Sequence, residues 1–184
     1  GLATGFIDLD YKTSGMQPSD LVLIAARPSM GKTAFVLNIA EYMAFRNEKH
    51  VAVFSLEMSK EQLINRMFSL ESHVDAQKIR TGDLSEGEWA DLIEGAETIG
   101  ESNLMIDDTP AITVGALRSK CMKFKMEHGL DMIIIDYLQL MSGSGARNSD
   151  SRQQEISEIS RSLKAVAREL NVPVVSLSQL SRAV

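Results

Sequence analysis

The segment ARPSMGKT, at positions 26–33, combines residue types that together bind phosphate groups. Gly31 lacks the Cβ that would keep a phosphate away from the backbone N–H groups. Lys32 brings a compact positive charge to the β- and γ-phosphates, and Thr33 offers a hydroxyl group to a magnesium ion. A helix that begins here adds its partial positive charge at the same place. The pattern predicts that this segment binds a nucleoside triphosphate together with Mg²⁺.

This segment departs in one respect from the usual phosphate-loop pattern, which begins with glycine, because Ala26 stands at that position. An ordinary turn between a strand and a helix that happens to contain Gly-Lys-Thr is the alternative interpretation. The strand and helix expected on either side favour the phosphate loop. The residues that we expect to contact the nucleotide are Ala26, Arg27, Pro28, Ser29, Met30, Gly31, Lys32, Thr33 and Ala34.

Hydrolysis of a bound triphosphate also needs an acidic group behind the metal and a group that activates water. Asp136 ends the run MIIID, at the C-terminal end of a predicted central strand, where ligands of parallel sheets bind. We expect it to support the magnesium ion together with Thr33, partly through water. Glu57 follows the run VAVFS and is a candidate general base toward the attacking water. Without a phosphate loop, either carboxylate would be interpreted as an ordinary polar residue after a strand.

Gln179 follows the last apolar run, in the segment SLSQLSR. A neutral amide can hydrogen-bond the γ-phosphate and lose that bond after hydrolysis. We therefore expect Gln179 to join Lys32 and Glu57 in the catalytic site, as a sensor of the γ-phosphate. The alternative is an exposed polar residue at the end of a strand.

The elements that would hold these residues alternate between strand and helix. Short apolar runs predict strands at 21–26, 51–55, 104–106, 132–136 and 172–177. Helical spacing predicts helices at about 32–46, 59–70, 85–99, 117–124 (which Gly129 ends) and 156–170, with capping boxes at Ser59–Gln62 and Ser85–Glu88. The polar, glycine-rich segment 142–151 predicts a mobile loop. This order predicts an α/β fold with a mainly parallel sheet and helices on both faces.

The composition limits the classes of protein to which the chain can belong. With 184 residues, 44% of them hydrophobic, it fits one soluble domain, and no apolar run is long enough to cross a bilayer. The net charge of −6 argues against a general nucleic-acid binder, so any contact with DNA must come from a local feature. The single cysteine, Cys121, lies on the apolar stripe of a predicted helix, which indicates a core residue in a reduced, cytoplasmic setting.

Several separate segments, taken in order, resemble the C-terminal ATPase domain of DnaB-family replicative DNA helicases. They are TGFIDLD at 4–10, ARPSMGKT, SLEMS, IIIDYLQLM, RQQEISEISRSLKAVAREL and SQLSR, and they extend over essentially the whole chain. The resemblance implies a single RecA-like P-loop NTPase domain over 1–184, with ATP and Mg²⁺ as cofactors. It also implies a hexameric ring in the cytoplasm that moves along single-stranded DNA and unwinds the duplex, with primase and a helicase loader as further partners in the primosome.

The same resemblance implies roles for individual positions. Lys32 and Thr33 would bind phosphate and magnesium, and Asp136 would support the magnesium ion. Glu57 would activate water, and Gln179 would report the state of the γ-phosphate. The segment 142–152 resembles the loop that binds DNA in the central channel, with Arg147 and Arg152 as its only positive charges. Contacts from these arginines to the DNA backbone would be sensitive to salt and largely independent of sequence.

The resemblance also implies that the chain is a fragment. A complete family member would add an N-terminal domain that supports ring assembly and primase contact, and a later segment that carries an arginine finger. We therefore expect slow hydrolysis from this fragment, since an arginine finger contributes about 10³–10⁵ in rate. Two other functions remain open: a RecA-type recombinase or repair ATPase, which would form a filament, and a non-motor scaffold that uses ATP for assembly. Glu57 argues against the scaffold, because assembly alone needs no activated water.

Overall fold

A five-stranded parallel sheet forms the centre of the computed structural model, which describes residues 15–26, 31–141 and 149–179. The strands are β1 (Leu21–Ala26), β2 (Val51–Ser55), β3 (Leu104–Asp107), β4 (Met132–Asp136) and β5 (Val174–Gln179). They lie in the order β1-β5-β4-β2-β3, and each neighbouring pair is parallel. The predicted parallel sheet is confirmed. The bounds of β1, β2 and β4 are those predicted, whereas β5 begins later and extends to Gln179.

The helical elements follow the predicted order with four differences. They are α2 (Gly31–Ala40), the π-helix η1 (Glu41–Arg46), α3 (Lys60–Ser72), α4 (Ala76–Thr81), α5 (Glu86–Glu101), α6 (Val114–Glu127), the 3₁₀-helix η2 (Leu138–Met141) and α7 (Ser149–Leu170). The single helix predicted over 32–46 changes to π-helical geometry after Ala40. The short helix α4 and the 3₁₀-helix η2 were not predicted. The last residues of the predicted loop 142–151 belong to α7, so Arg152 is helical.

The handedness of the connections explains why helices cover both faces of the sheet. From β1 through β2 to β3 the chain moves across the sheet in one direction, and it then returns through β4 to β5. Right-handed crossovers in opposite directions place their helices on opposite faces. Accordingly, Ile39 of α2 and Leu63 of α3 pack in one hydrophobic cluster, while Leu117 of α6 and Leu163 of α7 pack in the other.

Strand β4 shows how the sheet joins these two clusters. Met132 and Ile134 belong to the cluster under α2 and α3. Ile133 and Ile135 belong to the cluster under α6 and α7. All four side chains have no exposed surface, as expected for a central parallel strand with successive residues on opposite faces. The apolar run before Asp136 therefore serves both cores and fixes the position of its last residue.

The local signals at helix ends are confirmed. Both capping boxes form, so that Ser59 and Ser85 each accept from, and donate to, the residue three positions later. Helix α6 ends at Glu127, and Gly129 has a φ of +96°, in the left-handed region that glycine tolerates. The N–H of Gly129 donates to the carbonyl oxygen of Lys125 at 2.9 Å.

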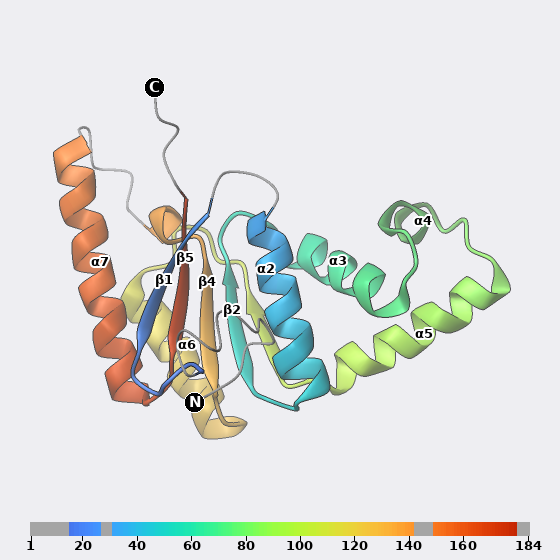
Figure 1. The fold of residues 1–184 in the computed structure, drawn as a ribbon, viewed down its shortest axis with the longest axis horizontal. Coiled ribbons are helices and arrows are strands. Elements are labelled where there is room, and N and C mark those ends of the chain that lie inside the picture. The colour runs from blue at the N-terminus through green and yellow to red at the C-terminus, as the bar shows by residue number, and fades with distance from the viewer. Residues whose placement is uncertain (1–14, 27–30, 142–148, 180–184) are drawn as a thin grey trace.

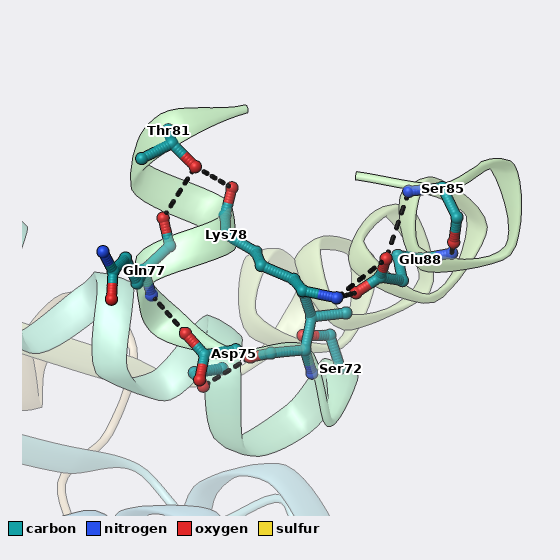
Figure 2. A network of polar contacts seen from close by, with 9 residues as sticks. Ser72, Asp75, Gln77, Lys78, Thr81, Ser85 and Glu88 are labelled. Carbon is teal, nitrogen blue, oxygen red and sulfur yellow. Dashed lines mark hydrogen bonds and ion pairs between the residues drawn. The ribbon is translucent and has the colours of Figure 1, made fainter. Parts of the chain in front are cut away.

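Helices α3, α4 and α5 extend away from the sheet (Figure 1). Figure 2 shows that Lys78 of α4 forms an ion pair with Glu88 of α5, with 3.2 Å between Nζ and Oε2. Helix α5 packs closely on α3 at Gly95, where an added Cβ would lie 3.4 Å from the Cβ of Ser72, at the near limit of ordinary van der Waals contact. Although Trp89 has helical spacing, 47% of its surface is exposed. Within the described residues, no helix is both long and apolar enough to cross a bilayer.

Candidate nucleotide-binding and catalytic site

Several residues selected from the sequence lie at the last position of a strand or shortly after it, at one edge of the sheet. The register places Ile24, Leu177, Asp136 and Ser55 level with one another across four strands. Ala26 and Gln179 pair with each other two positions beyond this row. Glu57 also comes two positions after the row, on the chain that leaves β2. The fold therefore brings the beginning of the phosphate loop, both carboxylates and the glutamine to the carboxyl edge of the sheet, where parallel sheets bind ligands.

The phosphate segment lies in the context that was predicted for it. Strand β1 ends at Ala26, and α2 begins at Gly31 at the same edge of the sheet (Figure 1). Lys32 and Thr33 fall in the first turn of α2, where backbone N–H groups have no helical partner and attract anions. The exposed Ala34 follows in the same helix. Arg27, Pro28, Ser29 and Met30 lie outside the described residues.

Glu57 lies in the turn between β2 and α3, with an exposed side chain. Hydrogen bonds hold this turn on both sides of Glu57. The Ser55 hydroxyl donates to the carbonyl oxygen of Met58 at 2.9 Å, and the N–H of Leu56 donates to the carbonyl oxygen of Asp136 at 2.8 Å. The second bond joins the turn to the end of β4, so the backbone that carries Glu57 has a fixed relation to the other predicted acidic residue.

Asp136 is the last residue of β4, and only 3% of its surface is exposed. The peptide bond that follows it, to Tyr137, is cis. A carboxylate oxygen from Asp136 and a hydroxyl oxygen from Thr33 are hard donors of the kind that Mg²⁺ prefers. Among the described residues no group of three or more His, Cys, Asp or Glu side chains could hold a metal ion. A magnesium ion bound through few protein ligands, with phosphate and water completing its shell, fits this donor set.

Strand β5 separates the strand of the phosphate loop from the strand of Asp136, and it ends at Gln179. The residue before it, Ser178, accepts a hydrogen bond of 2.8 Å from the side-chain amide of Gln139 in η2. This contact joins the segment after Asp136 to the end of β5. Neither Gln139 nor Ser178 was selected from the sequence, because no spacing rule relates positions so far apart.

Only one of the two predicted DNA-binding arginines lies within the described residues. Arg147 lies outside the described residues, whereas Arg152 lies near the start of α7 with its side chain exposed. Helix α7 begins at the same edge of the sheet as the phosphate segment (Figure 1). The described structure therefore places one of the two arginines on a helix, at the edge of the sheet where the predicted catalytic residues lie.

A family model described as "DnaB-like helicase C terminal domain" matches residues 1–184. The chain belongs to this family. It is 55% identical to the replicative DNA helicase DnaC of Bacillus subtilis and to the replicative DNA helicase DnaB of Geobacillus stearothermophilus, in each case over 184 residues. These matches cover 100% of this chain and 40% of each relative, so the DnaB-like domain spans less than half of the relatives' length.

Two solved structures have the same fold. One, described as an ATPase domain, matches with a TM-score of 0.89 and 42% identity, over 99% of this chain and 64% of that one. The other, a DnaB-like replicative helicase described with its primase interactions, matches with a TM-score of 0.87 and 42% identity, over 99% of this chain and 44% of that one. The RecA-like fold and the resemblance to DnaB-family helicases are confirmed.

Proposed function

We propose that this DnaB-like domain is the motor of a replicative DNA helicase, which couples ATP hydrolysis to movement along single-stranded DNA and to unwinding of the duplex. One observation carries the proposal. The strands that end at Asp136 and Gln179, and those that lead into the phosphate loop and Glu57, all end at a single edge of the sheet. The whole length of the chain matches the DnaB-like family.

The site residues would divide the reaction among them. Lys32 and the N–H groups at the start of α2 would bind the β- and γ-phosphates of ATP. Thr33 and Asp136 would hold Mg²⁺, which neutralises charge on the phosphates when it is bound. Glu57 would accept a proton from the water that attacks the γ-phosphorus. Gln179 would hydrogen-bond the γ-phosphate and lose that bond once the phosphate leaves.

The partners follow from the family and from local charge. We propose a hexameric ring in the cytoplasm, with Arg147 and Arg152 of each subunit facing single-stranded DNA in a central channel. A net charge of −6 makes such a local contact necessary, because the chain as a whole repels the DNA backbone. The description of one matching structure names interactions with primase. We extend that partner, together with a helicase loader, to the protein that contains this domain.

The test is the rate of ATP hydrolysis by the intact protein with and without single-stranded DNA. We expect DNA to stimulate turnover and Lys32→Ala to abolish it, while Lys123→Ala, at an exposed position on α6, leaves it unchanged. A rate of ATP hydrolysis that does not change when DNA is added would favour an ATP-dependent scaffold. Unchanged turnover in Lys32→Ala would mean that the active site is elsewhere. Unwinding of a forked duplex without strand exchange would then separate a helicase from a recombinase.

A further inference from the structure

The turn after β3 is hydrogen-bonded to the first residue of α3. The backbone N–H of Lys60 donates to Oδ2 of Asp108 at 2.8 Å. Lys60 is the first helical residue, and Glu57 stands three positions before it. We propose that Asp108 is a positioning residue for Glu57, acting through the backbone at the start of α3. This inference rests on the proposed function, in which Glu57 activates the attacking water.

Asp108 adds to the capping of α3. The first N–H groups of a helix have no partner inside the helix. The capping box supplies one partner, because the Ser59 hydroxyl accepts from the N–H of Gln62. The Gln62 side chain in turn accepts from the N–H of Ser59 at 3.1 Å. The carboxylate of Asp108, in the turn after β3, supplies the partner for the N–H of Lys60, so it joins the start of α3 to the segment that leaves the sheet.

Asp108 is in turn held by contacts of its neighbours. Oδ1 of Asp107 accepts from the N–H of Thr109 at 3.0 Å, and Oδ2 accepts from Nζ of Lys120 at 2.5 Å. The same Nζ donates to the hydroxyl oxygen of Thr109 at 2.9 Å. Lys120 belongs to α6, and Asp107 pairs with Phe54 of β2 in the sheet. The residues on both sides of Asp108 are therefore fixed to the body of the domain.

Contacts at both ends of the turn hold the backbone that carries Glu57. The turn of Glu57 is held at its β2 end by Leu56 and Asp136, and at its α3 end by Lys60 and Asp108. A general base must lie within about 2.6–3.2 Å of the oxygen atom whose proton it accepts. The side chain of Glu57 is carried by this turn, so a shift of the turn backbone shifts its carboxylate. Release of the α3 end would let that backbone move, and a displacement of about 1 Å can lower a rate about 100-fold.

The signal for Asp108 was present in the sequence. It follows the apolar run LMID at the C-terminal end of a strand, which is the rule that selected Asp136 and Glu57. The register shows its place at the edge, because Asp107 lies beside Phe54 and Ser55 lies beside Asp136. Asp108 differs from Asp136 and Glu57 in its partner. It accepts a hydrogen bond from a helix N–H and is assigned no contact with the nucleotide.

The test compares Asp108→Ala with Asp108→Asn in the intact protein, with ATP hydrolysis and thermal unfolding as readouts. Asparagine keeps an oxygen that can accept from the N–H of Lys60, and alanine does not. We expect Asp108→Ala to lower kcat by about 10–100-fold with KM for ATP within about threefold of wild type. We expect Asp108→Asn to stay within about threefold of wild type in kcat, because the hydrogen bond and not the charge is required.

Asp75→Ala is the matched control. Oδ1 of Asp75 accepts from the N–H of Gln77 at 2.8 Å at the start of α4 (Figure 2), a helix that lies away from the sheet (Figure 1). It should lower the melting temperature by about 2–4 °C, as loss of a cap does, and leave kcat unchanged. A value of kcat in Asp108→Ala within about threefold of wild type would overturn the inference, as would an Asp108→Asn variant as slow as Asp108→Ala.

A Glu57→Gln variant separates this inference from the function on which it rests. If Glu57→Gln hydrolyses ATP at the wild-type rate, the proposed catalytic role of Glu57 is wrong and the role of Asp108 fails with it. If Glu57→Gln is inactive while Asp108→Ala is normal, the proposed function stands and only the positioning role is wrong. If kcat falls in both Glu57→Gln and Asp108→Ala but stays near wild type in Asp108→Asn, the proposed function and the positioning role are both supported.

Discussion

The backbone N–H of Leu56 donates a hydrogen bond of 2.8 Å to the carbonyl oxygen of Asp136. This bond joins the turn that carries Glu57 to the end of strand β4. Because the bond uses only backbone atoms, it persists when the side chain of Asp136 or Glu57 is replaced. Variants at these two positions therefore test the chemistry of the carboxylates with little change in the geometry of the edge.

For Asp136→Asn we expect ATP turnover to fall about 100-fold or more, because a neutral amide supports Mg²⁺ much less well than a carboxylate. Binding of nucleotide in the absence of Mg²⁺ should change little. Turnover at increasing Mg²⁺ concentration, together with binding of a fluorescent ATP analogue, measures both effects.

Asp131→Asn provides the control at the opposite end of β4. Its carboxylate accepts from the N–H of His50 at 2.8 Å, and an asparagine oxygen can accept the same bond. Equal loss of turnover in Asp131→Asn and Asp136→Asn would show that the effect comes from the fold and not from magnesium.

We expect Arg152→Ala to weaken binding of single-stranded DNA and to reduce its dependence on salt. Each lost phosphate contact should lower the slope of log K against log salt by about 0.7 for single strands. Fluorescence anisotropy of a labelled oligonucleotide at several salt concentrations gives this slope. Arg161→Ala, an exposed arginine further along α7, should leave it unchanged. A slope that is the same in Arg152→Ala and wild type would contradict the proposed contact.

Removal of the Lys120 side chain should lower the free energy of unfolding by an amount that depends on pH. Burial raises the pKa of Asp107, but hydrogen bonds from Lys120 and Thr109 outweigh it and hold that pKa below the ordinary value of 3.8. A lowered folded pKa stabilises the protein above pH 3.8, and this contribution is lost as the pH falls through the folded value. Lys120→Met should therefore lower the free energy of unfolding by about 1 kcal/mol at pH 7.

Urea unfolding over a range of pH measures this effect. The difference between Lys120→Met and wild type should narrow as the pH falls below 3.8, where Asp107 becomes protonated in both. Lys123→Met, at an exposed position on the same helix, serves as the control. A difference that stays constant with pH would mean that Lys120 contributes through packing rather than through Asp107.

Cys121 should resist thiol reagents while the protein is folded. Its side chain has no exposed surface, and burial, with a smaller contribution from Asp107, raises the pKa of the thiol to about 12. Because the thiolate is the reactive form, labelling at pH 8 should be slow until denaturant is added. Since the folded pKa exceeds the ordinary value of 9.0, stability should fall as the pH rises from 9.0 toward 12. Rapid labelling of the native protein would contradict this.

The sequence predicts those parts of the fold that depend on local patterns. The apolar runs at β1, β2 and β4 are short and bounded by polar residues, so their limits agree with the structure. The change from α2 to the π-helix η1 follows from backbone hydrogen bonding that apolar spacing does not reveal. Helix α4 is only six residues long and has no buried residue, so it has no apolar stripe to detect.

The candidate site was predictable to a similar degree. The rule that polar residues after parallel strands meet at one edge selected Asp136, Glu57 and Gln179, and the register places these strand ends at the same edge. The contacts that hold the site were not predictable, because they join residues distant in the sequence. Gln139 with Ser178 and Lys60 with Asp108 are of this kind, and only the three-dimensional fold brings them together.

Strand β1 pairs with β5 at one margin of the sheet, so the strand before the phosphate loop depends on nearly the last described residues of the chain. During synthesis, Leu21 leaves the ribosome long before its partner Val174 exists. Such non-local pairing must pay the entropy of closing a very long loop. We therefore expect a nascent chain to acquire nucleotide affinity late, in a single step when β5 docks. Stalled chains that end before Pro173 should not be protected from protease by ATP, whereas released chains should be.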